Sequence, residues 1–186
     1  MEEVYEMGQQ SPNEFDLKVD LAGSVREPFA RLQIWVDGLQ VGRGNAINFT
    51  ALLSASLSTG RHFVFTCQCG DAGCGGIEDG VEVEVEGSWV RWTLRFPQST
   101  DLFGGDIGHW RKAVKPTVWL FEQQEMLREI RQELVYADYH HPWRTEYSAH
   151  GVRRRHLAGM VEKIDRRMAR LKKPQWYPME SEYLVN

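Results

Sequence analysis

Apolar residues alternate with polar residues in several short segments of the chain, and this period of two predicts strands with one buried face. The alternation is clearest from Phe15 to Leu21 and from Val81 to Val85, where aspartate, lysine or glutamate fills the intervening positions. A second strand is expected from about Leu32 to Val36. Asp37-Gly38 then supplies the positive φ angles of a tight turn, and Leu39–Val41 returns. These segments predict antiparallel hairpins.

The middle of the chain predicts three further strands. Arg61 to Cys67 is β-rich and mostly apolar, which is typical of a central strand. The valine-glutamate strand turns at Gly87-Ser88 and returns through Trp89–Phe96, so that Arg91 and Arg95 are expected across from the glutamates. Residues 97–116 predict a long loop between two prolines, and 117–121 a last strand.

Helical periods frame these strands. Residues 48–58 predict a short helix closed by Gly60, and a final helix is expected from about Ser148 to Leu171. Between them a helix begins near Glu122 and breaks at 138–142. Its apolar stripe is Met126, Leu127, Ile130 and Leu134, and its expected outer face is Glu122, Glu125, Glu129 and Glu133.

This order of elements predicts an α+β fold, in which a mainly antiparallel sheet packs with a short helix and two C-terminal amphipathic helices. The 186 residues suit one domain with an appendage. We expect a flexible N-terminus over 1–14, an α+β domain with a Cys/Gly-rich loop over 15–136, and a basic C-terminal helix and tail over 137–186.

Charge is unevenly spread along the chain. Residues 152–175 carry nine Lys or Arg and two Asp or Glu, a balance of +7, whereas the rest has a balance of −11 within the net −4. The usual interpretation of such a run is a solvated helix face, and docking against the glutamate-rich helix at 122–136 would pair the opposite charges within the fold. An acidic body also offers a surface to a basic partner.

The acidic start of the sequence lacks the basic and apolar regions of a secretory signal, and we find no apolar run long enough to cross a bilayer. Three cysteines fit a secreted disulfide framework poorly. These features predict a cytoplasmic protein without membrane association.

One dense motif offers metal or thiol chemistry, in the segment Cys67-Gln68-Cys69-Gly70-Asp71-Ala72-Gly73-Cys74. Glycines permit the reversal that would bring Cys74 back to Cys67 and Cys69, and three thiolates would supply most of a tetrahedral zinc site. Small buried thiols in a structural turn are the main alternative, and a reactive cysteine is a third. Apart from this zinc, the sequence predicts no cofactor.

The cysteine motif also carries a resemblance. Cys67, Cys69, Gly70, Gly73 and Cys74, followed by the alternating valines, the Val90–Trp92 pair and the segment from Pro116 to Leu127, resemble a family of uncharacterised bacterial cytoplasmic proteins. The resemblance covers about residues 61–130 and implies a small intracellular α+β protein, with no activity attached.

No catalytic constellation emerges: the glycines lack a phosphate-loop lysine, no serine lies in a nucleophile elbow, and the histidines lack ligand spacing. We therefore assign no catalytic residue and expect a non-enzyme. The leading hypothesis is a protein-binding module of the bacterial cytoplasm, of the immunity or inhibitor type, which neutralises a basic toxin or enzyme. The alternative is a nucleic-acid-associated regulator that binds through Arg166, Arg167 and Arg170.

Overall fold

The computed structural model describes residues 11–23, 28–42, 45–66, 71–72, 80–94, 116–140 and 154–171. Within these ranges the chain forms antiparallel strands and three helices, as the α+β prediction requires. In chain order the elements are β1 (Phe15–Gly23), β2 (Pro28–Val36), β3 (Leu39–Val41), β4 (Ala46–Ile47), α1 (Phe49–Leu57), β5 (Gly60–His62), β6 (Phe65–Thr66), β7 (Val81–Glu86), β8 (Trp89–Leu94), β9 (Thr117–Glu122), α2 (Gln123–His140) and α3 (Arg154–Arg170).

The described strands form three antiparallel sheets, with the orders β1-β2-β3, β4-β6 and β5-β7-β8-β9. The predicted hairpins are confirmed in register, with Phe15 opposite Val36 and Glu84 opposite Arg91. Asp37 and Gly38 have φ angles of 50° and 75°, so the first turn has the left-handed geometry that the Asp-Gly pair predicts.

The central strand predicted from Arg61 to Cys67 is wrong. The segment divides into β5, an edge strand of the four-stranded sheet, and β6, which pairs with β4 in another sheet. Phe63 and Val64 lie between them, and the Val64 carbonyl accepts a hydrogen bond from the Asn48 backbone N–H at 2.8 Å. The chain passes from one sheet to the next at these two residues.

Helix α1 confirms the short helix predicted over 48–58. The Asn48 side chain caps its start by accepting from the Ala51 N–H at 3.0 Å, and Ser58 caps its end by donating its N–H to the Ser54 carbonyl. Gly60, expected to close the helix, instead begins β5 with a φ of 145°.

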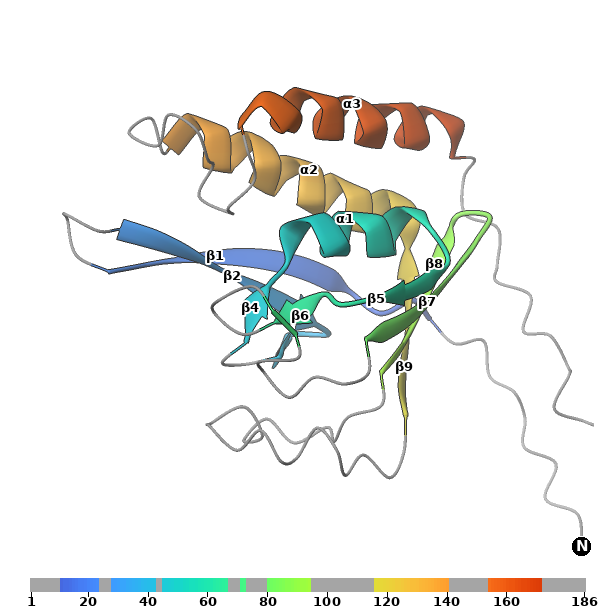
Figure 1. Cartoon of the computed structure of the whole chain (residues 1–186). Coiled ribbons are helices and arrows are strands. Elements are labelled where there is room, and N and C mark those ends of the chain that lie inside the picture. Colours follow the sequence, from blue (N-terminus) through green and yellow to red (C-terminus); the bar gives the residue numbers. More distant parts are fainter. Residues whose placement is uncertain are drawn as a thin grey trace, which may run out of the picture.

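Figure 1 shows how the layers are arranged: α1 and α2 lie on the same side of the sheets, and α3 lies farther out along α2. The apolar stripe predicted for α2 is buried, with Met126, Leu127, Ile130 and Leu134 each at most 1% exposed. The helix continues to His140, past the break expected at residue 138.

One buried core joins the sheets to the helices. At its centre the rings of Phe15, Trp92 and Phe121 meet edge to face, with centroids 5.3–6.0 Å apart, in the arrangement that aromatic quadrupoles favour. Asn13 links two sheets at this level, because its N–H donates to the Leu120 carbonyl at 2.7 Å and its side chain accepts from the Leu120 N–H at 2.8 Å. Asn13 lies within the N-terminal segment predicted to be flexible.

Candidate functional site

The three cysteines of the predicted zinc motif, Cys67, Cys69 and Cys74, lie outside the described residues, so the zinc site stays a prediction. Arg95 and the loop expected over 97–116 lie outside them as well, except for Pro116. Within the described part of the chain, no group of three or more His, Cys, Asp or Glu side chains is placed to hold a metal ion.

Helix α3 packs along α2, which confirms the predicted docking of the two helices but not the charge pairing on which the prediction was based. Leu157 and Ile164 of α3 are buried, at 6% and 0% exposure, and join the common core. Across this contact Arg131 of α2 donates to Asp165 of α3 at 2.7 Å. The cation of this pair is on α2 and the carboxylate is on α3, whereas the sequence predicts cations of α3 paired with glutamates of α2. The contact between the two helices is mainly apolar.

The three arginines singled out in α3 have different environments. Arg166 is exposed and lies 3.5 Å from Glu162, and Arg170 is exposed near the end of the helix. Arg167 instead points toward the fold: its Nε and Nη2 donate to the Gln123 side-chain oxygen at 2.9 and 2.6 Å, and Nη2 also donates to the Gly87 carbonyl at 2.9 Å.

Gln123 is the centre of this polar contact and is fully buried. Its side-chain amide donates to the Ser56 carbonyl at the end of α1 at 2.7 Å, and its backbone N–H donates to the Ser88 carbonyl at 2.8 Å. Together with Arg167 it ties α1, the β7–β8 turn, α2 and α3 to one point. The guanidinium of Arg167 is therefore part of the framework of the fold.

Sequence reasoning missed Gln123, although a signal was present. At 100° per residue, a helical projection places Gln123 within roughly 10° of the centre of the apolar stripe of α2. A glutamine on that side of the helix points the same way as the apolar stripe, and when it is buried its amide needs partners for both the oxygen and the nitrogen.

A cluster of three carboxylates forms where α2 passes over β1, from Asp16, Glu129 and Glu133. Glu129 accepts a hydrogen bond from the Leu17 backbone N–H, and both burial and the nearby Asp16 raise its pKa. Asp16 is also 3.2 Å from the Lys18 ammonium, which lies 4.2 Å from the centre of the Trp35 ring. The elements that pack together thus gather like charges that are far apart in sequence.

Glu133 is the most perturbed member of this carboxylate cluster. Its pKa is raised to about 7, first by burial and then by the charges of Glu129 and Asp16. Its Oε2 atom is buried without a hydrogen-bond partner in the described structure. Glu129 and Glu133 were expected on the outer face of α2, which is wrong, because both are partly buried toward β1. The sequence carried no signal for this, because Glu125 also directly precedes a stripe residue and is exposed.

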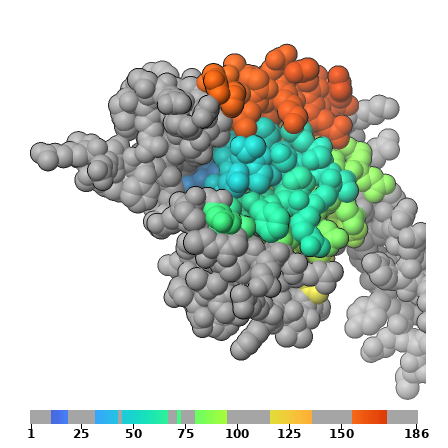
Figure 2. Space-filling model, in the orientation of Figure 1, coloured from blue at the N-terminus to red at the C-terminus, as the bar shows by residue number. Residues whose placement is uncertain are grey.

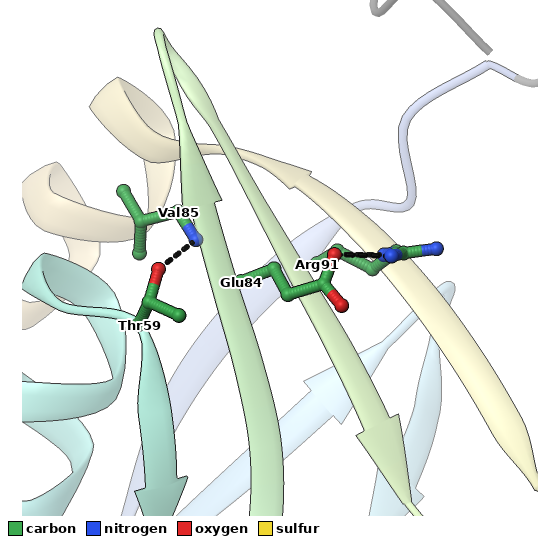
Figure 3. A network of polar contacts seen from close by, with 4 residues as sticks. All are labelled: Thr59, Glu84, Val85 and Arg91. Carbon is green, nitrogen blue, oxygen red and sulfur yellow. Dashed lines mark hydrogen bonds and ion pairs between the residues drawn. The ribbon is translucent and has the colours of Figure 1, made fainter. Parts of the chain in front are cut away.

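The outer face of β7 carries a second set of glutamates, Glu82, Glu84 and Glu86, all exposed. The predicted cross-strand pairing is confirmed for Arg91, whose guanidinium contacts the Glu84 carboxylate (Figure 3). Figure 3 also shows Thr59, which directly precedes β5 and whose hydroxyl accepts from the Val85 N–H of β7 at 2.9 Å. This face therefore neutralises part of its own charge.

No family model, no curated protein and no solved structure matches this chain. The resemblance of residues 61–130 to a bacterial family therefore stays a prediction. Among the helices that the structure describes, none is long and apolar enough to cross a membrane.

Proposed function

We propose that the protein is a non-catalytic binding module of the bacterial cytoplasm, of the immunity or inhibitor type, which neutralises a basic toxin or enzyme by stoichiometric binding. The carboxylate cluster of Asp16, Glu129 and Glu133 supports this proposal. The observation that carries it is the Oε2 atom of Glu133, which is buried without a partner beside two other carboxylates.

A buried carboxylate oxygen without a partner is unfavourable, and neighbouring negative charges make it more so. A lysine or arginine from a partner would supply the opposite charge on the exposed side of the cluster, and rotation of the Glu133 side chain would bring Oε2 into a charge-assisted hydrogen bond, which is stronger than a neutral one. The carboxylates lie on a helix and a paired strand, so little ordering is required on binding.

The partner's cation would also change the ionisation of the site. Because an opposite charge favours the ionised carboxylate, binding should lower the pKa of Glu133 from its value of about 7. Binding should therefore weaken as the pH falls from 8 to 6, since protons then compete with the partner for Glu133.

Affinity purification of the tagged protein from its own host, with nuclease present, tests the proposal. We expect one protein to co-purify in stoichiometric amount, and we expect the purified chain to inhibit the activity of that protein. The same protein should not co-purify with the Glu129→Gln/Glu133→Gln variant. The control variant Glu86→Gln/Glu125→Gln loses the same amount of charge at exposed positions and should still bind the partner protein. Equal retention by both variants, or a captured protein whose activity is unaffected, would contradict the proposal.

A further inference from the structure

The exposed half of α3 is divided by charge. Helical geometry at roughly 100° per residue places its exposed cations within a sector of about 80°. These cations are Arg155, Lys163, Arg166 and Arg170. Of the carboxylates of the helix, Glu162 projects at the border of this sector, roughly 20° from Arg155, and Asp165 lies farther round, where Arg131 binds it. The apolar stripe of α3, formed by Leu157, Met160, Val161, Ile164, Met168 and Leu171, faces the opposite direction, toward α2.

The cations of this stripe are available to a ligand. In the part of the chain that the structure describes, Lys163 and Arg170 make no ion pair, and Arg155 donates from Nε to the exposed His156 ring at 3.3 Å. The contact of Arg166 with Glu162 is 3.5 Å long and joins two side chains that are both more than 60% exposed, so it contributes little. Figure 2 shows α3 as an outer ridge of the molecule, in orange-red.

The geometry of the stripe favours one class of ligand. A membrane-surface helix must insert an apolar face, and in α3 that face is already buried through Leu157 and Ile164. What remains is a polar row that extends roughly 22 Å from Arg155 to Arg170, at 1.5 Å per residue. Each strand of a duplex carries one phosphate per about 3.4 Å of helix axis, so a row of this length spans enough of the backbone for the four cations to reach separate phosphates.

We propose that α3 is a binding surface for the phosphodiester backbone of a nucleic acid duplex, which contacts Arg155, Lys163, Arg166 and Arg170 without reading base sequence. The surface is independent of the carboxylate cluster, so each proposal can fail alone. Arg167 is not part of it, because its guanidinium holds Gln123 and Gly87. A charge reversal at Arg167 would perturb the fold together with any binding.

Fluorescence anisotropy with 20-base-pair DNA and RNA duplexes of scrambled sequence tests the proposal with the full chain. Four phosphate contacts predict that the logarithm of the association constant falls with the logarithm of salt concentration with a slope of about −3.6. In Arg166→Gln/Arg170→Gln the slope should be about −1.8, with binding at 50 mM salt weakened by about tenfold or more. The control variant Arg61→Gln/Arg128→Gln loses the same amount of charge at exposed positions on β5 and α2 and should keep the affinity of the wild type.

Salt-dependent binding of either duplex that is lost in the α3 variant and retained in the control supports the proposal. It is overturned if neither duplex binds at 50 mM salt, or if both variants lose the same affinity. Binding to vesicles of anionic phospholipid without binding to either duplex also overturns it. Thermal unfolding of both variants within about 2 °C of the wild type establishes that the comparison reports on the surface.

Discussion

Replacing Glu133 by glutamine should stabilise the protein at alkaline pH and leave its stability unchanged in acid. Glutamine keeps the shape of the side chain and removes the charge that burial and the neighbouring carboxylates disfavour. The pKa of Glu133 is raised in the folded protein from 4.5 to about 7. The folded state therefore binds the proton more tightly than the unfolded state between these two pH values.

The sign of the effect follows from this difference. Stability falls as the pH rises from 4.5 to 7, because over this range the unfolded chain releases the proton before the folded protein does. Below pH 4.5 the carboxyl is protonated in both states and carries no penalty. Above pH 7 it is ionised in both states, and the full penalty applies to the wild type and not to the variant.

The size of the effect can be worked from the pKa of Glu133. A change from 4.5 to about 7 corresponds to about 3.4 kcal/mol at 1.36 kcal/mol per pH unit. Because the side chain is only half-buried, solvent screening reduces the expected penalty to about 1.5 kcal/mol. For a chain of this size that corresponds to an increase in Tm of roughly 3 to 6 °C.

Chemical and thermal unfolding of the wild type and Glu133→Gln at pH 4.5 and pH 8 measure the effect. Glu125→Gln serves as the control, because Glu125 lies on the same helix and is exposed. An increase in Tm of equal size at both pH values would refute the reasoning, since it would show that packing rather than charge causes the difference in stability between the variant and the wild type. An unchanged Tm at pH 8 would refute it as well.

Three further substitutions test the framework that positions these surfaces, each by urea unfolding. Arg167→Ala removes the donors from the buried oxygen of Gln123 and should destabilise the fold by about 1 to 3 kcal/mol. Arg166→Ala, at an exposed position on the same helix, should change the free energy of unfolding by less than about 0.5 kcal/mol. Similar losses in the two variants would argue against the Gln123 contact. Gly42→Ala places a Cβ against the Phe65 ring at a φ of 66° and should destabilise the fold by more than about 2 kcal/mol. Gly38→Ala is the control, because Gly38 has a φ of 75° with open space around it and should cost only about 1 kcal/mol of backbone strain. Equal costs for the two variants would show that the Phe65 ring moves aside. Ile164→Ala, at a fully buried position in α3, should lower the free energy of unfolding by about 2 to 5 kcal/mol. A decrease below about 1 kcal/mol would mean that α3 does not unfold cooperatively with the rest of the fold.

Much of the secondary structure could be predicted because it depends on local periodicity. The first hairpin followed from the alternation of Phe15–Leu21 and from the Asp37-Gly38 turn, whose positive φ angles few other residue pairs allow. The apolar stripe of α2 and the amphipathic character of α3 followed from the helical period. The short helix followed from Asn48 and the apolar run after it.

The candidate surfaces depended on which elements pack together. The pattern from Arg61 to Cys67 was consistent with one strand, but in the described residues β5 pairs with β7 and β6 pairs with β4, which divides the segment between two sheets. Glu129 and Glu133 read as solvent-facing because the sequence does not show that β1 passes beside them. Periodicity reports the direction of a side chain relative to its own element, not the neighbour that covers it.

The sequence by itself determined the alternation that makes the strands, the turn residues that join them, and the excess of positive charge from 152 to 175. The tertiary structure decided how that charge is used. It buries the apolar stripe of α3 against α2, directs Arg167 inward to Gln123 and leaves Arg166 and Arg170 exposed. The physical reason is that desolvation and charge–charge interactions depend on distances between elements, and these are set by packing.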